Sequence, residues 1–234
     1  MRIAVVIPAR LASTRFPRKL LADLHGKPVL RWTWEAACRA HLPERVVIAV
    51  DGMELAEAAA AWGATVITTS SHHASGTDRV AEVARGLEVD ALVNVQGDEP
   101  GLDPGLVDRV AARLADGAEW VTAATALNTS AWHSPQVVKV VVDGVSRALW
   151  FSRAPIGNAD VALRHVGIYG WTTATLRRFA TLPAHPLERA ESLEQLRGLV
   201  AGLQLDVVHI QDAVGAVDTV QDLERLRREW QISR

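Results

Sequence analysis

The chain has 234 residues, a formal net charge of −2 and a hydrophobic fraction of 49%, which is enough for a large core. A charge so close to zero gives no overall positive field, so we expect neither nucleic acid nor an anionic membrane surface as a partner. No apolar run approaches the roughly 20 residues that span a bilayer. The chain begins directly with a strand, which leaves no room for a signal peptide and predicts a single cytoplasmic domain over residues 1–234. The only cysteine, Cys38, excludes an internal disulfide and a cysteine-based zinc site, and its apolar neighbours predict a small core residue.

The first twenty residues predict a buried strand that runs into a binding loop. The apolar run 3–7 ends at Pro8, as is typical of a buried strand entering a loop. The loop carries four cations and no acidic residue: Arg10, Arg15, Arg18 and Lys19. Two cations about 8 Å apart repel by roughly 0.5 kcal/mol in water and roughly 2 kcal/mol at an effective dielectric near 20. The loop therefore favours a polyanion such as a triphosphate; the alternative is a solvated basic loop screened by salt.

Strands and helices alternate along the first half of the chain. Apolar strand-like runs follow at 45–50, 65–68 and 91–95, and helices are expected at 27–37, with Pro28 in the first turn, at 53–62 and at 77–85. Continuous apolar strands between helices predict a mostly parallel sheet that is covered on both faces. The fold class is therefore α/β and Rossmann-like.

The pattern changes after residue 119. Strand-like runs at 120–126, 137–142, 148–152 and 166–171 have few helices between them, which predicts a small β-rich, mixed-sheet extension over about 120–190. This extension is the expected place for a substrate site and a dimer surface. An amphipathic helix at 187–200, a strand at 205–210 and a closing helix at 219–230 complete the chain.

Acidic residues stand at two places that could face the basic loop. Asp98 belongs to Gln96-Gly97-Asp98-Glu99-Pro100, at the end of a predicted central strand. Mg²⁺ typically uses one or two protein carboxylates beside water and substrate oxygens, so Asp98 is a candidate magnesium ligand; the alternative is a turn in which it caps backbone. Asp218 is either a second magnesium ligand or the N-cap of the last helix, with Gln221 completing a capping box.

Three further groups suit smaller parts of a ligand. The helix start at residues 75–79 offers backbone N–H groups to a base, ribose or phosphate, and ordinary helix capping is the alternative. Arg153 and the pair Arg164-His165 lie near strand ends, where Arg and His suit a carboxylate or a hydroxyl-rich ligand. A lone His or Tyr on a strand is more often structural, and the pair at 194–195 falls in the middle of a predicted helix, where a solvated face is the default. The common GxxxxGK[ST] and GxGxxG phosphate motifs are absent.

Taken together, the order and spacing of these motifs resemble the 3-deoxy-manno-octulosonate cytidylyltransferase family. The resemblance covers nearly the whole chain and rests on these stretches: IPARLASTRFPRKLL, SSHHASGTDRVAE, LVNVQGDEP, VVKVV, FSRAPI, RHVGIYGW, PLERAESLEQLR and VDTVQDLERLR. It implies a nucleotidyltransferase α/β fold, a homodimer, a Mg²⁺ cofactor and a cytoplasmic enzyme of lipopolysaccharide synthesis. The implied reaction joins CTP and 3-deoxy-manno-octulosonate (Kdo) to give CMP-Kdo and pyrophosphate.

The resemblance also implies roles for individual residues. Around the triphosphate it places Arg10, Arg15 and Lys19, and on Mg²⁺ it places Asp98 and Asp218. On the cytidine side of CTP it places Ser75, Gly76, Thr77, Arg79 and Gln96, with Asp78 where the family commonly has Glu. Facing the acidic sugar it places Arg153, His165, Tyr169, Glu194 and Gln195.

The chain departs from the family pattern in places. The segment 155–163 is shorter than in typical members, Arg18 stands at a usual glycine, and Trp171 at a usual tyrosine. The short segment keeps transfer of CMP to another acidic sugar open, either an 8-amino Kdo or a sialic acid. GTP or UTP as the nucleotide, and a nucleotide-binding sensor without turnover, are the remaining alternatives.

Overall fold

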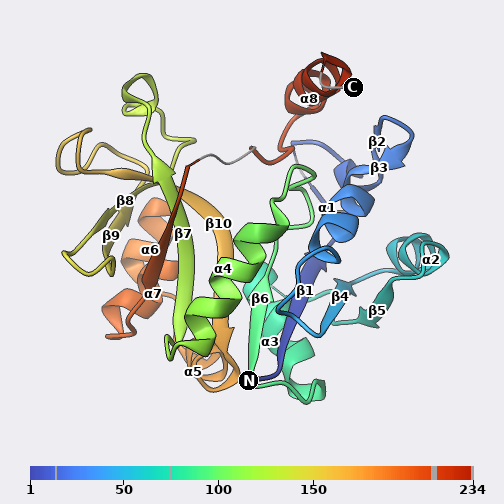
Figure 1. Cartoon of the computed structure of the whole chain (residues 1–234), viewed down its shortest axis with the longest axis horizontal. Coiled ribbons are helices and arrows are strands. Elements are labelled where there is room, and N and C mark those ends of the chain that lie inside the picture. Colours follow the sequence, from blue (N-terminus) through green and yellow to red (C-terminus); the bar gives the residue numbers. More distant parts are fainter. Residues whose placement is uncertain (14, 74, 212–214, 233–234) are drawn as a thin grey trace.

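The fold is built on one central sheet of nine strands. The computed structural model describes residues 1–13, 15–73, 75–211 and 215–232. The strands are β1 (Ile3–Ala9), β4 (Arg45–Val50), β5 (Thr65–Thr68), β6 (Ala91–Asn94), β7 (Trp120–Ala126), β8 (Lys139–Val142), β9 (Ala148–Ser152), β10 (Leu163–Thr172) and β11 (Asp206–Ile210). Their order across the sheet is β11-β7-β10-β6-β1-β4-β5, and β8 and β9 extend it from the beginning of β10 (Figure 1).

Strand direction separates the sheet into a parallel core and a mixed extension. β6, β1, β4 and β5 run parallel to one another, and β11 is parallel to β7. β10 is antiparallel to β6, β7 and β8, and β8 is antiparallel to β9. The prediction of an α/β fold with a mostly parallel sheet and a β-rich mixed extension is confirmed.

Helices cover both faces of the sheet. They are α1 (Val29–Ala37), α2 (Met53–Ala61), α3 (Gly76–Gly86), α4 (Pro104–Ala115), α5 (Thr173–Thr181), α6 (Pro186–Glu191), α7 (Gln195–Val200) and α8 (Val220–Ile232). In β1, Ile3, Val5 and Ile7 pack with α1, α2 and α4, whereas Ala4 and Val6 pack on the side of α3, α5 and α7. Burial on both faces is why this strand is a continuous apolar run. None of the helices within the described ranges has the length and apolarity that crossing a membrane requires.

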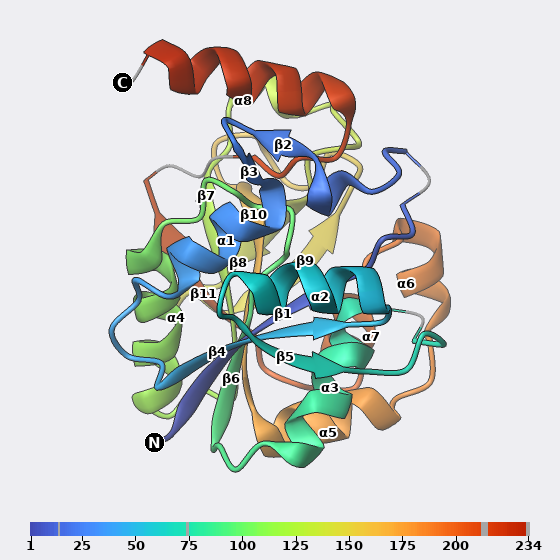
Figure 2. The same ribbon diagram turned by 90° about the vertical axis from the view of Figure 1, so that its right-hand side faces the viewer.

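A third, small apolar cluster attaches the last helix to the beginning of the chain. Leu223 and Leu226 of α8 pack with Leu24, Val29 and Val217. Leu24 belongs to a short hairpin, β2 (Asp23–Leu24) and β3 (Lys27–Pro28), over which α8 lies in Figure 2. The cluster thus fixes the chain just before α8 beside the basic loop at residues 10–19.

Several expected elements differ in the structure. The predicted helix start at 27–28 belongs instead to β3, and Pro28 is the N-cap of α1. The single helix predicted at 187–200 is two helices, because Ser192 adopts a left-handed conformation (φ 53°) that interrupts the hydrogen-bond ladder. Cys38 was expected in the core but is exposed, because it follows the last turn of α1.

Two helices were missed, although both begin at ordinary capping residues. Asp103 accepts a hydrogen bond from the backbone of Gly105 and precedes Pro104, the first residue of α4. Thr172 ends β10 and caps α5 at once, through its bond from the N–H of Thr175. The expectation of few helices after residue 119 is therefore wrong for α5, since a strand that leads directly into a helix leaves no turn in the sequence.

A tight contact between α7 and the sheet yields a test of the packing. A Cβ added to Gly198 would lie 2.7 Å from two ring atoms of Trp120. We expect Gly198→Ala to lower the free energy of unfolding by about 1–3 kcal/mol, since overpacking forces backbone or ring shifts. Gly86→Ala, at the exposed end of α3 with open space around its Cβ, is the matched control and should not destabilise. Urea unfolding of the two variants measures both effects; equal stability would contradict the packing argument.

Candidate active site

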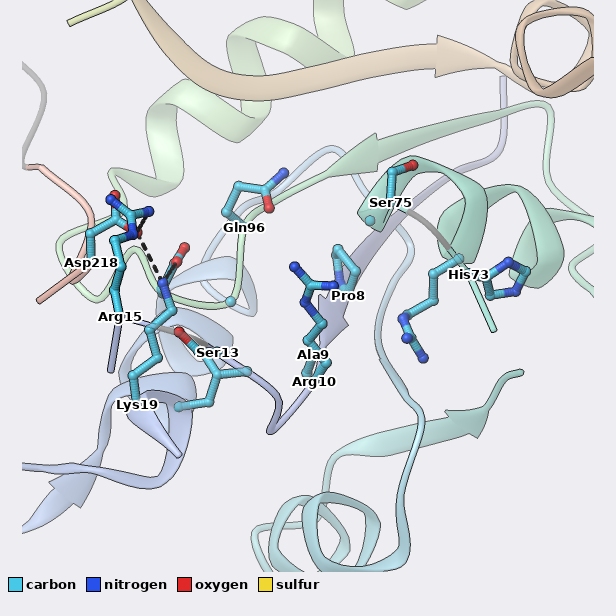
Figure 3. Close-up of a pocket in the computed structure, with 15 residues that line it drawn as sticks. Pro8, Ala9, Arg10, Ser13, Arg15, Lys19, His73, Ser75, Gln96 and Asp218 are labelled. Carbon is cyan, nitrogen blue, oxygen red and sulfur yellow. Dashed lines mark hydrogen bonds and ion pairs between the residues drawn. The ribbon is translucent and has the colours of Figure 1, made fainter. Parts of the chain in front are cut away.

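A cavity of about 340 Å³ opens where β1 and β6 end at the same edge of the sheet (Figure 3). Ligands of open α/β sheets bind at this edge. Most residues predicted to bind CTP or metal line it: Arg10, Arg15, Lys19, Ser75, Gly76, Arg79, Gln96, Asp98 and Asp218. Gly97 allows close packing there, because a Cβ would lie 3.1 Å from Leu30 and 3.3 Å from the carbonyl oxygen of Pro8. The family resemblance placed segments 10–19, 75–79, 96–98 and 218 around one nucleotide and its metal, and the structure brings residues of all four to one cavity.

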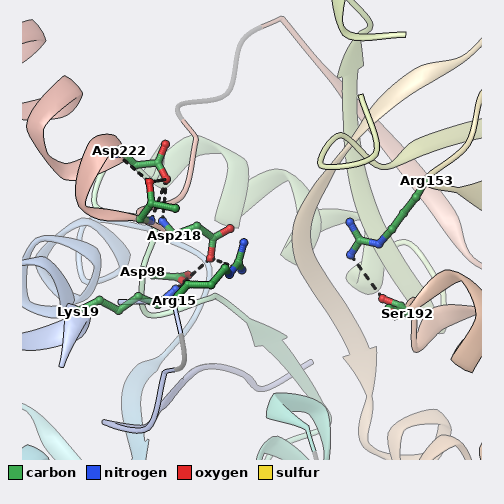
Figure 4. A network of polar contacts seen from close by, with 8 residues as sticks. Arg15, Lys19, Asp98, Arg153, Ser192, Asp218 and Asp222 are labelled. Atoms are coloured by element: carbon green, nitrogen blue, oxygen red, sulfur yellow. Dashed lines mark hydrogen bonds and ion pairs between the residues drawn. The ribbon is translucent and has the colours of Figure 1, made fainter. Parts of the chain in front are cut away.

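The cations of the basic loop meet carboxylates from distant parts of the chain. Lys19 Nζ contacts carboxylate oxygens of both Asp98 and Asp218, the latter at 3.1 Å, and Arg15 bonds to Asp218 at 2.9 Å (Figure 4). Lys19 and Asp98 are largely buried, so this pair is screened little by solvent. The repulsion expected within the loop is therefore compensated locally by the tertiary structure.

Two other arginines of the loop differ in their surroundings. Arg10 is exposed and makes no hydrogen bond or ion pair with the residues that the structure describes, and it points into the cavity in Figure 3. Arg18 pairs with Glu54 of α2 and does not line the cavity. Arg18 also has a left-handed backbone (φ 59°), a conformation that glycine adopts at no steric cost. This agrees with the expectation, from the family resemblance, of a glycine at this position.

The carboxylate of Asp218 is available to the site because its neighbour caps the helix. The sequence allowed Asp218 to be an N-cap with Gln221, and this reading is wrong. Thr219 and Asp222 form the reciprocal bonds instead: the N–H of Asp222 donates to Thr219 Oγ1, and the N–H of Thr219 donates to Asp222 Oδ2 at 2.9 Å. The side chain of Asp218 is left to contact Lys19 and Arg15.

The first turn of α3 forms the opposite wall of the cavity. Ser75 caps the helix in a capping box with Asp78, so the capping interpretation is confirmed, and the residue lines the cavity as well. Arg79 is buried and donates to Asp51 at 2.9 Å and to Thr69, neither of which sequence reasoning named. Asp51 follows β4 directly, and this position at the end of a strand could have identified it as a candidate site residue.

His73 also lines this cavity, although the sequence analysis gave it no role. Its ring nitrogen Nε2 is bonded to a carboxylate oxygen of Glu82, nine residues further along on α3. That contact lowers the pKa of Glu82 and fixes the orientation of the imidazole ring. The sequence did not point to His73, because no other ligand residue stands at a metal-binding spacing from it.

A second cavity of about 960 Å³ adjoins the first, because Arg15 and Asp218 line both. It contains Arg153 and His165, which were predicted to face the acidic sugar. Arg164, which the sequence analysis paired with His165, lines it too, as do residues that sequence reasoning did not assign: Glu99, Gln136, Ser192, Asp222 and Arg225. The two cavities together could hold a nucleotide and a second polar substrate.

Arg153 is held firmly at the edge of this second cavity. Its guanidinium donates to the backbone oxygens of Glu191 at 2.9 Å and Pro135 at 3.1 Å. Its backbone N–H donates to the carboxylate of Glu191 at 2.8 Å. Arg153 therefore connects β9 to the end of α6 and to the loop before β8.

Burial keeps two ionisable groups near the second cavity neutral. Desolvation lowers the pKa of His165 to about 3, and its Nε2 lies 2.9 Å from the hydroxyl oxygen of Thr122. Burial raises the pKa of Glu99 to about 8, the neighbouring Asp98 and Asp218 add to this rise, and Arg164 opposes it. At neutral pH, His165 is thus an uncharged imidazole and Glu99 is mostly a carboxylic acid.

Four predicted ligand residues line neither cavity: Thr77, Tyr169, Glu194 and Gln195. The hydroxyl of Thr77 donates to Glu194, which is the N-cap of α7 and not a mid-helix residue. Burial raises the pKa of Glu194, which its bond from Thr77 counteracts, and burial together with the charge of Glu194 raises the pKa of Tyr169. Gln195 is buried as well. These residues form a closed polar group between α3, α7 and β10.

The fold and these two adjoining cavities are typical of nucleotidyltransferases. A family model described as Cytidylyltransferase matches residues 4–207. The 3-deoxy-manno-octulosonate cytidylyltransferase of Leptothrix cholodnii is 46% identical, with 97% of this chain and 90% of the relative covered. That of Pseudomonas syringae is 45% identical, with 96% of both chains covered. The chain belongs to the cytidylyltransferase family, among the 3-deoxy-manno-octulosonate cytidylyltransferases.

Solved structures agree with this placement. The structure of CMP:2-keto-3-deoxy-manno-octonic acid synthetase complexed with CTP matches with a TM-score of 0.96 and 36% identity over 100% of both chains. A 4-diphosphocytidyl-2C-methyl-D-erythritol synthase from Anaerococcus prevotii shares the fold alone, with a TM-score of 0.68 at 12% identity. The expected nucleotidyltransferase α/β fold is thereby confirmed.

The buried neutral histidine gives a pH test. In the unfolded chain His165 takes up a proton near its ordinary pKa of 6.5, whereas the folded protein resists protonation down to about 3. Its contribution to stability is therefore present above pH 6.5 and declines as the pH falls, by up to about 1.4 kcal/mol per unit. We expect the free energy of unfolding of His165→Gln to fall less steeply between pH 6.5 and 4.5 than that of the wild type. Urea titrations at three pH values measure this, and parallel slopes would contradict it.

Proposed function

We propose that this chain transfers CMP from CTP to Kdo and releases pyrophosphate. Similarity over nearly the full length to enzymes of that name carries the proposal. The two adjoining cavities support it, because a nucleotide in the first would present its phosphates to a sugar in the second across Arg15 and Asp218. The named relatives do not favour sialic acid or a nucleotide sensor without turnover.

The reaction we propose is an in-line displacement at the α-phosphorus. The anomeric C2 hydroxyl of Kdo attacks, a new bond forms between this oxygen and the α-phosphorus, and the bond to the pyrophosphate oxygen breaks. Such chemistry depends mainly on positioning and charge stabilisation. Arg10, Arg15 and Lys19 would stabilise the charge of the leaving pyrophosphate, since their cationic groups border the first cavity.

On the cytidine side, Ser75, Gly76, Arg79 and Gln96 would bind the nucleoside. The wall of α3 supplies a hydroxyl and backbone N–H groups, and the Asp51 carboxylate fixes the Arg79 guanidinium in place. Thr77 lies in the same turn but does not line the cavity, so it would support this wall from behind. Arg153 and His165 would bind the carboxylate and hydroxyls of the sugar in the second cavity, with Tyr169, Glu194 and Gln195 beyond them.

Asp98 and Asp218 are the residues we propose to hold Mg²⁺. No group of three or more His, Cys, Asp or Glu side chains in the described part of the chain is arranged around a metal position. The two carboxylates nevertheless converge on one cation, Lys19 Nζ, and Mg²⁺ that bridges a nucleotide needs only one or two protein carboxylates. When bound, Mg²⁺ would neutralise phosphate charge and lower the pKa of the attacking hydroxyl.

We also propose a homodimer and a cytoplasmic location, as the family resemblance implies. Among the described strands β9 forms a ladder only with β8; apart from one backbone bond, from the N–H of Ala148 to the carbonyl oxygen of Leu205, its other edge pairs with no described strand, and Leu149 is 59% exposed. An open edge with apolar side chains suits a second copy of the chain. Light scattering that gave the mass of a single chain would contradict the dimer.

The proposed activity is tested by measuring pyrophosphate release with CTP and Mg²⁺. We expect release that depends on added Kdo. Parallel reactions contain 8-amino Kdo, a sialic acid, or GTP or UTP in place of CTP. Release only with another acidic sugar would change the substrate, and CTP binding without release for any sugar would favour the sensor.

Removal of one proposed metal carboxylate should slow the reaction without unfolding the protein. We expect Asp98→Asn to lower kcat by about 10²–10³-fold, the usual cost of losing one charge contact to the transition state. Asp103→Asn is the matched control, because Asp103 is an exposed carboxylate that caps α4 away from both cavities, and asparagine also caps well. A kcat for Asp98→Asn within a few-fold of the wild type would make the metal assignment wrong.

A further inference from the structure

The last helix, α8, is attached to the rest of the chain through a contact surface of its own. Its buried leucines, Leu223 and Leu226, belong to the small third cluster and to neither of the two core clusters of the central sheet. Figure 2 shows α8 lying across the hairpin β2–β3, on the side away from the sheet. A segment that buries few apolar groups opens locally at a lower free-energy cost than global unfolding requires. The position of α8 therefore depends on a small number of contacts.

Two tryptophans anchor the far end of this helix. The ring of Trp230 on α8 meets the ring of Trp32 on α1 edge-on, with the ring centroids 5.2 Å apart. Trp32 is itself held from two directions. Its indole Nε1 donates to the backbone oxygen of Leu24 at 2.7 Å, and Lys27 Nζ lies 4.6 Å from the centroid of its ring. Neither tryptophan lines either of the two adjoining cavities, so the pair can affect the site only through α8.

The other end of α8 carries Asp218 into the site. Asp222, in the first turn of the helix, accepts a hydrogen bond from the N–H of Asp218 at 3.2 Å (Figure 4). The Asp218 carboxylate therefore follows the position of the helix. A helix rises about 1.5 Å per residue, which puts Trp230 about 15 Å from the beginning of α8. Asp218 and the tryptophan contact are thus at opposite ends of one rigid element.

This distant anchor matters most when the proposed nucleotide is bound. Without nucleotide, the cations of Arg15 and Lys19 hold the Asp218 carboxylate. A triphosphate would take up these cations and would place Asp218 beside several negative charges, which repel it. Ion pairing then no longer retains this carboxylate, whereas the contact between Trp32 and Trp230 is unaffected by charge.

We propose that Trp32 and Trp230 are positioning residues, which act through α8 to keep Asp218 in the site when a nucleoside triphosphate engages the basic loop. This inference rests on the proposed function. A carboxylate that is kept beside the phosphates against charge repulsion is able to share a divalent cation with them. Without the tryptophan contact, nucleotide binding would release α8 and remove the carboxylate from the site.

Hydrogen exchange of the α8 amides, in EDTA with and without saturating CTP, tests the proposal. In the wild type we expect the exchange of α8 to change by less than about twofold when CTP is added. In Trp230→Ala it should become at least about tenfold faster, because the cations leave Asp218 and no aromatic contact retains the helix. Trp230→Phe keeps the ring contact and should behave as the wild type does. An increase of less than twofold in Trp230→Ala would overturn the proposal, and so would an equal increase in the wild type.

Trp62→Ala is the matched control. Trp62 is also half-buried with a cation near its ring, Arg31 at 6.0 Å, but it packs in the first core cluster of the sheet and not in the cluster of α8. This variant should lower the Tm without making α8 exchange faster when CTP is added. In the turnover assay, Trp230→Ala should raise the Mg²⁺ concentration for half-maximal rate at least about fivefold, and Trp62→Ala should leave it within twofold. A wild type that does not bind CTP would refute the proposed function, whereas CTP binding without release of α8 in Trp230→Ala would refute only the role of the tryptophans.

Discussion

The cation of Lys19 is the interaction on which the site depends. Its ammonium group joins the end of β1 to Asp98, which follows β6, and to Asp218, which precedes α8. Two carboxylates so close would repel each other without a cation between them, and the cations of the loop would repel one another without the carboxylates. The ion cluster and the apolar contacts of α8 therefore hold the same three segments together. A site assembled in this way already provides paired positive and negative charges for the proposed nucleotide substrate.

The division of the sheet into a parallel core and a mixed extension separates the tasks of the site. The carboxyl ends of β1, β4 and β6 supply charged loops for the nucleotide, as is usual for open α/β sheets. The antiparallel β10 crosses between the two parts and carries His165 into the lining of the second cavity. Placing the two substrates side by side lets binding supply much of what catalysis of phosphoryl transfer requires.

Burial, more than charge pairing, sets the protonation states of His165 and Glu99 at the second cavity. His165 is neutral and Glu99 is mostly protonated, because both are desolvated. Asn94 and Gln195 have buried polar atoms without a hydrogen-bond partner in the described part of the chain. Such groups are costly to the fold, and functional sites are where a protein retains such a cost.

The sequence by itself determined the fold class, most strands and much of the nucleotide site. Continuous apolar runs between helices are local patterns, and the motifs around Arg15, Asp98 and Arg79 are short enough to be recognised within the chain. Helix boundaries were predicted less well where the residue type does not reveal the break. Ser192, for example, adopts the left-handed conformation that divides the predicted helix at 187–200. Only the tertiary structure decided that Thr219, not Asp218, caps α8, that Asp51 fixes Arg79, and that the buried amide of Asn94 has no partner among the described residues. Each of these depends on which distant side chains share one space, and sequence periodicity carries no information about contacts made across the sheet.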